Sequence, residues 1–119
     1  MNHQATHTAS RSLQACIQMC QDCHTTCLQT LSYCLTQGGE HTEKGHLTTL
    51  QDCADICQTS ADFMLRESHL HQHTCQACAE ICLHCAEHCS KMNDETMQRC
   101  ADVCRQCAES CREMASMHH

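Results

Sequence analysis

Residues 75–89 read CQACAEICLHCAEHC, with five cysteines separated by steps of three, four, three and four residues. Steps that average 3.5 residues bring successive side chains onto one face of an α-helix. The residues between the cysteines include acidic, amide, small and imidazole side chains. The stretch therefore predicts a helix whose buried face is made of thiols.

Three further segments repeat this spacing, and we predict helices over residues 10–37, 44–68, 72–91 and 94–115. The chain of 119 residues has no proline and only three glycines, which suits long helices joined by short turns. Short connections make neighbouring helices antiparallel. We predict an all-α fold, an antiparallel up-down four-helix bundle over residues 10–117 with a cysteine-lined core, preceded by a disordered tail over residues 1–9. The sixteen cysteines are Cys16, Cys20, Cys23, Cys27, Cys34, Cys53, Cys57, Cys75, Cys78, Cys82, Cys85, Cys89, Cys100, Cys104, Cys107 and Cys111.

Local signals mark the breaks between the helices. Gly38 and Gly39 predict a left-handed end to the first helix. Thr42 and Asn93 are the predicted N-caps of the second and fourth helices, since short polar side chains can accept a backbone hydrogen bond there. Ser68 marks the joint between the second and third helices.

Composition excludes several classes of function. With seven basic and fourteen acidic residues, no tryptophan, one phenylalanine and one tyrosine, the chain has neither a basic stripe nor an aromatic platform for nucleic acid. We find no apolar run long enough to span a membrane and no apolar segment typical of a secretion signal near the start. Sixteen cysteines without such a signal indicate a reducing compartment, where thiols stay free.

The two ends of the predicted bundle differ. One end gathers ordinary apolar side chains and is expected to be plugged; the other gathers sulfur and imidazole donors. His46 lies seven residues before Cys53, Met92 three after Cys89, and Met97 three before Cys100, so each continues a cysteine stripe and is a candidate metal ligand. The expected plug consists of Leu13, Phe63, Met64, Leu65, Leu70 and Met114.

A core of sixteen thiols calls for an occupant, because cysteine is smaller than leucine and close packing makes a hollow axis costly. Disulfides within one helix would be strained, since neighbours three or four residues apart are roughly 5–6 Å apart at Cβ. Four zinc ions would leave about eight negative charges buried, and iron–sulfur clusters are usually held by loops. Cu(I) is soft and monovalent, so multiple ions per chain could neutralise the thiolates one for one.

The segments CADIC at 53–57, CQACAEIC at 75–82, HCAEHC at 84–89 and CADVCRQCAESC at 100–111 resemble the bacterial copper storage proteins, in particular their cytosolic form. The resemblance implies a non-enzymatic store of many Cu(I) ions, with all sixteen cysteines as ligands and access at one end. It also implies a homo-oligomer, commonly a tetramer, in the bacterial cytoplasm, with copper as partner. A copper chaperone is a further candidate partner, which would dock at the donor-lined end. The chain departs from that pattern at His46 and Met97, where cytosolic members tend to have cysteine.

Two other hypotheses remain open at this point. A thiol-based redox or zinc-binding regulatory protein would need at least one exposed cysteine of low pKa. A purely structural helical module would be equally stable with and without metal.

Overall fold

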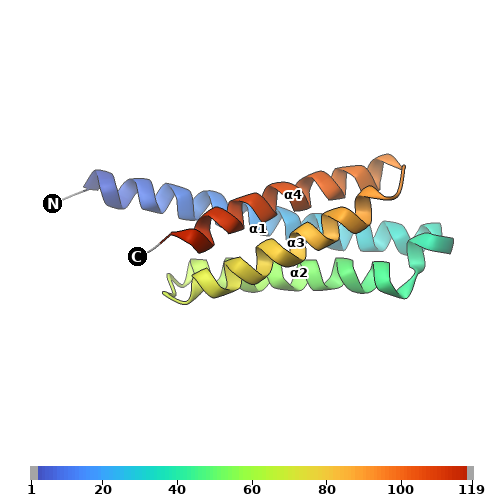
Figure 1. The fold of residues 1–119 in the computed structure, drawn as a ribbon, viewed down its shortest axis with the longest axis horizontal. Coiled ribbons are helices and arrows are strands. Elements are labelled where there is room, and N and C mark those ends of the chain that lie inside the picture. Colours follow the sequence, from blue (N-terminus) through green and yellow to red (C-terminus); the bar gives the residue numbers. More distant parts are fainter. Residues whose placement is uncertain (1–2, 118–119) are drawn as a thin grey trace.

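The computed structural model describes the backbone of residues 3–117 and the side chains of residues 11–117. Four helices, α1 (His3–Gln37), α2 (Lys44–Leu65), α3 (His71–Ser90) and α4 (Glu95–Ser116), follow one another in up-down order (Figure 1). A short 3₁₀ helix, η1 (Gly39–Thr42), joins α1 to α2. The predicted all-α four-helix bundle is confirmed.

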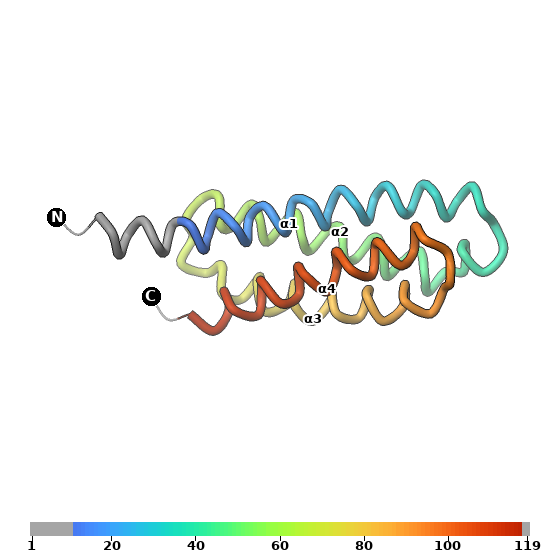
Figure 2. The backbone as a smooth tube through the Cα atoms, turned by 90° about the horizontal axis from the view of Figure 1, so that it is seen from above, coloured from blue at the N-terminus to red at the C-terminus, as the bar shows by residue number. Residues whose placement is uncertain are grey.

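The helices form an elongated bundle of 58 × 22 × 19 Å. Helix α1 packs against α2 and α4, and α3 packs against the same two helices. The α1–α2 and α3–α4 connections lie at one end, whereas the α2–α3 turn lies at the other end, beside the end of α4 (Figure 2). We call the first the donor end and the second the closed end.

The predicted helix bounds differ from the observed ones by at most three residues, except at the start of α1. That helix begins at His3, seven residues before the predicted start. Because residues 1–2 and the side chains of residues 1–10 lie outside the described part of the chain, the disordered tail over 1–9 stays a prediction. Among the helices of the described residues, none is long and apolar enough to cross a membrane.

The glycine turn after α1 is confirmed, because Gly38 and Gly39 have φ angles of 72° and 59°. The two predicted N-caps are wrong. Glu43 occupies the N-cap position of α2 and makes no side-chain hydrogen bond to that helix. The Thr42 hydroxyl donates to the carbonyl of Gly39 inside η1, at 2.8 Å.

Asp94, not Asn93, is the N-cap residue of α4, and it makes no side-chain hydrogen bond to that helix. Its carboxylate accepts a hydrogen bond from the Tyr33 hydroxyl at 2.8 Å, and His41 Nε2 lies 3.2 Å from its other oxygen. Asp94 therefore connects α4 to α1 and η1 at the donor end.

The bundle interior is mostly sulfur. Every one of the sixteen cysteines has no solvent-exposed surface. Among the described side chains, buried hydrocarbon comes from a few larger residues and from alanines that let the helices approach closely. These buried apolar residues are Ile17, Leu50, Ala54, Ala61, Met64, Ala79, Ala86, Met97, Ala101, Ala108 and Met114.

Candidate metal centre

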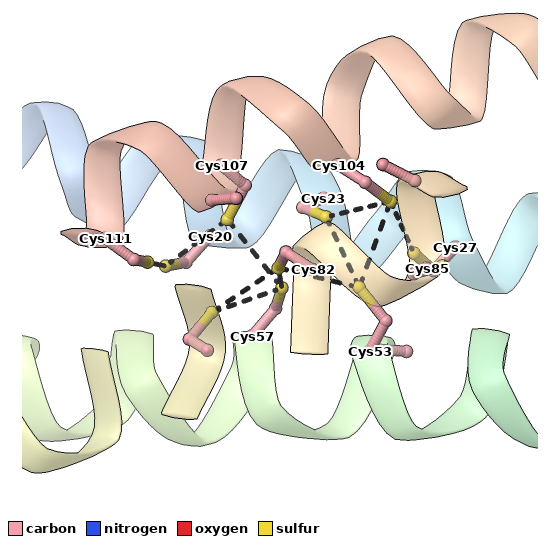
Figure 3. Close-up of a cluster of buried hydrophobic side chains, with 14 of the residues drawn as sticks. Cys20, Cys23, Cys27, Cys53, Cys57, Cys82, Cys85, Cys104, Cys107 and Cys111 are labelled. Atoms are coloured by element: carbon pink, nitrogen blue, oxygen red, sulfur yellow. Dashed lines mark hydrogen bonds between the residues drawn. The ribbon is translucent and has the colours of Figure 1, made fainter. Parts of the chain in front are cut away.

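Thiols from all four helices meet along the bundle axis. Figure 3 shows labelled cysteines of α1, α2, α3 and α4 directed toward one another rather than toward solvent. The closest sulfur pair, Cys20 and Cys111, is 3.4 Å apart, and the remaining contacts between facing thiols run up to 3.9 Å. All sixteen cysteines are free thiols. The predicted cysteine-lined core is confirmed, whereas the ligand role of each cysteine stays a prediction.

Ten of these thiols form an ordered column, which we call the thiol ladder. It consists of five successive pairs, and each pair lies together with the next in a group of four whose sulfurs are all within 4.8 Å of one another. Adjacent groups therefore share two sulfurs. From the closed end toward the donor end the pairs are Cys20/Cys111, Cys78/Cys107, Cys57/Cys82, Cys23/Cys53 and Cys27/Cys104.

At the closed end the ladder passes into a group of only three thiols, Cys16, Cys75 and Cys111, which we call the closed-end triad. Cys75 also contacts the Met64 thioether sulfur at 3.8 Å and the Ser60 hydroxyl at 3.4 Å. Helix α2 thus contributes a thioether and a hydroxyl here in place of further thiols.

The expected apolar plug at the closed end is partly wrong. Met64 and Met114 are buried and Leu13 packs against the core. Leu65 and Leu70, however, are 52% and 47% exposed, because they lie at the end of α2 and in the turn that follows it.

At the donor end, two of the three predicted non-thiol ligands converge on one sulfur. Cys34 Sγ lies 3.4 Å from His46 Nε2 and 3.7 Å from the Met97 sulfur. His46 and Met97 are both buried. This trio offers a thiol, an imidazole and a thioether to one ion.

Met92, the third predicted ligand, lies farther out and is only partly buried. It lines an open hollow of about 140 Å³ at the donor end, together with His46, His88, Lys91 and two glutamates, Glu40 and Glu43.

His88 is a candidate ligand that the sequence analysis missed. Its ring stacks on His46 with centroids 5.4 Å apart, and the two Nδ1 atoms are 3.3 Å apart. His88 precedes Cys89 and lies off the cysteine stripe, so a search along the stripe passes over it. The antiparallel pairing of the start of α2 with the end of α3 is the signal that could have found it.

Leucine and threonine interrupt the row of donors between the trio and the ladder. Leu50 and Thr30 are buried where the stripes of α2 and α1 would continue with cysteine. On α3 and α4 the row is unbroken, and the thiols at this level are Cys85, Cys89 and Cys100. These three and Cys34 belong to no group of sulfurs within 4.8 Å among the described residues.

Burial sets the protonation of the donor end. It raises the pKa of Cys34 to about 11, so this thiol keeps its proton at neutral pH. Burial, together with the neighbouring His88, lowers the pKa of His46. His46 is therefore neutral, which is the form of imidazole that binds metal.

The sulfur column has no buried counter-charge. Among residues 11–117, the buried polar side chains are Thr30, His46 and Ser60, and none of these is an acid, a lysine or an arginine. Deprotonating several thiols would leave net negative charge in a medium of low dielectric unless a cation binds.

A helical bundle whose core is a continuous column of thiols, with imidazole and thioether at one end, belongs to the cysteine-rich metal-binding bundles. The family model described as "copper storage protein" matches residues 8–116. The chain belongs to the copper storage protein family.

Several solved structures are similar to this chain. Nmul_A1745 of Nitrosospira multiformis is 45% identical, with a TM-score of 0.87, covering 92% of this chain and 99% of that one. The Cu(I)-bound copper storage protein BsCsp3 is 35% identical, with a TM-score of 0.84, covering 88% and 99%. A cytosolic copper storage protein of Streptomyces lividans, bearing five coppers, is 26% identical, with a TM-score of 0.79, covering 92% and 96%.

Proposed function

We propose that this protein stores Cu(I), holding many ions per chain through the thiolates of its sixteen cysteines. The observation that carries the proposal is the uninterrupted column of buried sulfurs in the thiol ladder. Thiolate is the soft ligand that Cu(I) prefers. One monovalent ion per thiolate neutralises the column without any other buried charge. This matters because no lysine or arginine is buried among the described residues.

Zinc is a weaker candidate as the stored ion. Because adjacent four-thiol groups share two sulfurs, at most two groups of the ladder can be filled without sharing ligands. Each Zn²⁺ bound by four thiolates would also carry two net negative charges into the core.

A thiol-based redox or regulatory role is also a weaker candidate. Such a role needs a cysteine that its reaction partner can reach. All sixteen cysteines are fully buried, so the arrangement favours storage over exchange with a large partner.

The donor end is the proposed site of access to the core. Met92 and His88 border the hollow that opens to solvent, and His46 lies between His88 and Cys34. Thioethers and imidazole are neutral ligands, so they can receive an ion and release it inward to thiolates that bind more strongly. His46, Met92, Met97 and His88 would act in transfer, whereas the cysteines would hold the stored ions.

Anaerobic titration of the reduced protein with Cu(I), against a chromophoric Cu(I) chelator, tests the storage proposal. We expect binding to continue until roughly one ion is bound per thiol, with about one proton released per ion. Saturation at one or two ions per chain would overturn the proposal. Replacing His46 and Met97 together should slow loading while it leaves the capacity within about two ions of the original.

We further propose that the protein works without catalytic turnover, as a homotetramer in the bacterial cytoplasm, and that a copper chaperone delivers ions at the donor end. The family suggests a storage role, and the similar Streptomyces lividans protein is described as cytosolic.

Light scattering after gel filtration tests the assembly, since a monomeric mass near 13.4 kDa would contradict it. Fractionation of the producing cells tests the location.

A further inference from the structure

The closed-end triad differs from the ladder in the number of its donors. Its sulfurs, from Cys16, Cys75 and Cys111, lie within 4.8 Å of one another. Among the described residues, Cys16 and Cys75 belong to no four-thiol group, and only Cys111 is shared with the ladder. The neighbours of the Cys75 thiol outside the triad include the neutral hydroxyl of Ser60 and the neutral thioether of Met64.

Charge decides which ion suits three thiolates in this place. A monovalent ion on three thiolates leaves two net negative charges, and a divalent ion leaves one. A trivalent ion leaves none. Of the described side chains that are buried, none is a lysine or an arginine that could offset the excess, so among single ions bound by the three thiolates only a trivalent one leaves no buried net charge.

We propose that the closed-end triad binds trivalent arsenic, taken up as neutral arsenous acid. As(III) is thiophilic and three-coordinate, so the triad supplies the number of soft donors that it needs. Arsenous acid, As(OH)₃, condenses with three thiols, so that three As–O bonds break and three As–S bonds form. The three thiol protons leave with the three hydroxides as three waters, and arsenic stays in oxidation state III. Reactants and product are uncharged, and the step requires no oxidant or reductant.

This inference concerns a second ion and does not rest on copper binding. The ladder offers its sulfurs in fours, one more than a three-coordinate ion uses, so we expect the first equivalent of arsenic at the triad and later equivalents in the ladder. Access lies through the closed end, where Leu65 and Leu70 are exposed and the described side chains that cover the core, among them Met64, Met114 and Leu13, are apolar. A small uncharged molecule crosses such an apolar cover at lower cost than an ion does.

The test uses the full chain, copper-free, reduced and anaerobic, titrated with sodium arsenite at pH 7. Sulfur-to-arsenic charge-transfer absorption follows binding, and alkylation of the remaining thiols followed by mass spectrometry maps the protected cysteines. With one equivalent we expect protection of Cys16, Cys75 and Cys111. The variant Cys75→Ser should weaken the first equivalent by at least about tenfold. The matched control Cys27→Ser, which removes an equally buried ladder thiol, should leave it within about threefold.

Circular dichroism of each variant shows whether the bundle is intact, and Cys16→Ser provides a second triad variant with the same expected loss. X-ray absorption at the arsenic edge should give a shell of three sulfurs. Protection by the first equivalent of ladder thiols other than Cys111, in place of Cys16 and Cys75, would overturn the proposal. So would equal weakening by Cys75→Ser and Cys27→Ser in folded protein.

Discussion

The shared sulfurs of the thiol ladder make a sharp prediction about a divalent probe. Cd²⁺ is soft and accepts four thiolates in a tetrahedron, as Zn²⁺ does. The ladder contains four overlapping groups of four, and two groups at most can be filled without a shared ligand. We therefore expect the ladder of the intact protein to take up two Cd²⁺ ions, compared with about ten Cu(I) at one per thiolate.

Single substitutions should change this number unequally. Cys78→Ser removes both groups at the closed-end side of the ladder and leaves two groups that share the pair Cys23/Cys53, so the capacity drops to one. Cys57→Ser also removes two groups, but the two that remain lie at opposite ends of the ladder and share nothing, so the capacity stays at two. Both cysteines are fully buried, which makes the second variant a matched control for the first.

The assay is a titration of the reduced, copper-free protein with Cd²⁺, followed by thiolate-to-cadmium charge-transfer absorption. Equilibrium dialysis and metal analysis give the number of ions bound. Because each filled group carries two net negative charges, Cd²⁺ should bind less tightly than Cu(I), and the capacity is the quantity to compare. Equal capacities in Cys57→Ser and Cys78→Ser would refute the arrangement of shared pairs, as would four independent Cd²⁺ ions in the ladder.

Three further predictions concern protons, packing and the donor end. Burial raises the pKa of Cys34 to about 11, so an ion that binds there must displace a proton. The contribution of Cys34, measured as the ratio of the metal affinities of the original protein and Cys34→Ser, should therefore become about tenfold smaller for each pH unit below 11. A ratio that does not change in competition titrations between pH 6 and 9 would contradict this. Leu50→Ala should lower the free energy of unfolding of the copper-free protein by about 2–5 kcal/mol, because the leucine is fully buried. Leu35→Ala, at a site that is 61% exposed, should change it by less than about 0.5 kcal/mol, and urea unfolding measures both. Burial favours a higher pKa for Asp94, but hydrogen bonds with Tyr33 and His41 outweigh it and lower that pKa below 3.8. The resulting stabilisation is present above pH 3.8 and is lost as the pH falls through the lowered value. Asp94→Asn should therefore be less stable than the original protein at neutral pH, and the two should converge in strong acid, which thermal unfolding across pH would test.

The helices and the sulfur core could both be predicted from the sequence because the spacing of the cysteines indicates both. A cysteine every three or four residues fixes the helical period, the buried face and the identity of the core side chains together. No competing apolar stripe exists, so the positions of Cys53 and Cys57, for example, follow from register alone. The buried His46 and Met97 were predicted on the same ground.

The errors lie where side chains had several partners to choose from. Thr42 bonds within a 3₁₀ turn that the sequence analysis did not expect, and the Asp94 carboxylate bonds to residues on α1 and η1 rather than capping its own helix. Leu65 was assigned to the plug from its apolar character, but its place at the end of α2 leaves it half exposed. His88 contacts His46 on another helix, so this pairing depends on how α2 and α3 align in space, which spacing within one helix does not determine.

Neighbouring four-sulfur groups of the ladder share two sulfurs, and this sharing affects how a soft cation can move along the bundle axis. An ion held by Cys20, Cys111, Cys78 and Cys107 already has two of its four ligands in the group that follows. It can advance by exchanging only the other two, so a bare charge is never stranded in the dry interior. When one ion leaves a group, an ion in the neighbouring group can move into the empty position by the same exchange of two ligands. Movement of ions along the ladder then requires only local ligand exchange, so we expect the rates of metal loading and release to be set at the ends of the ladder.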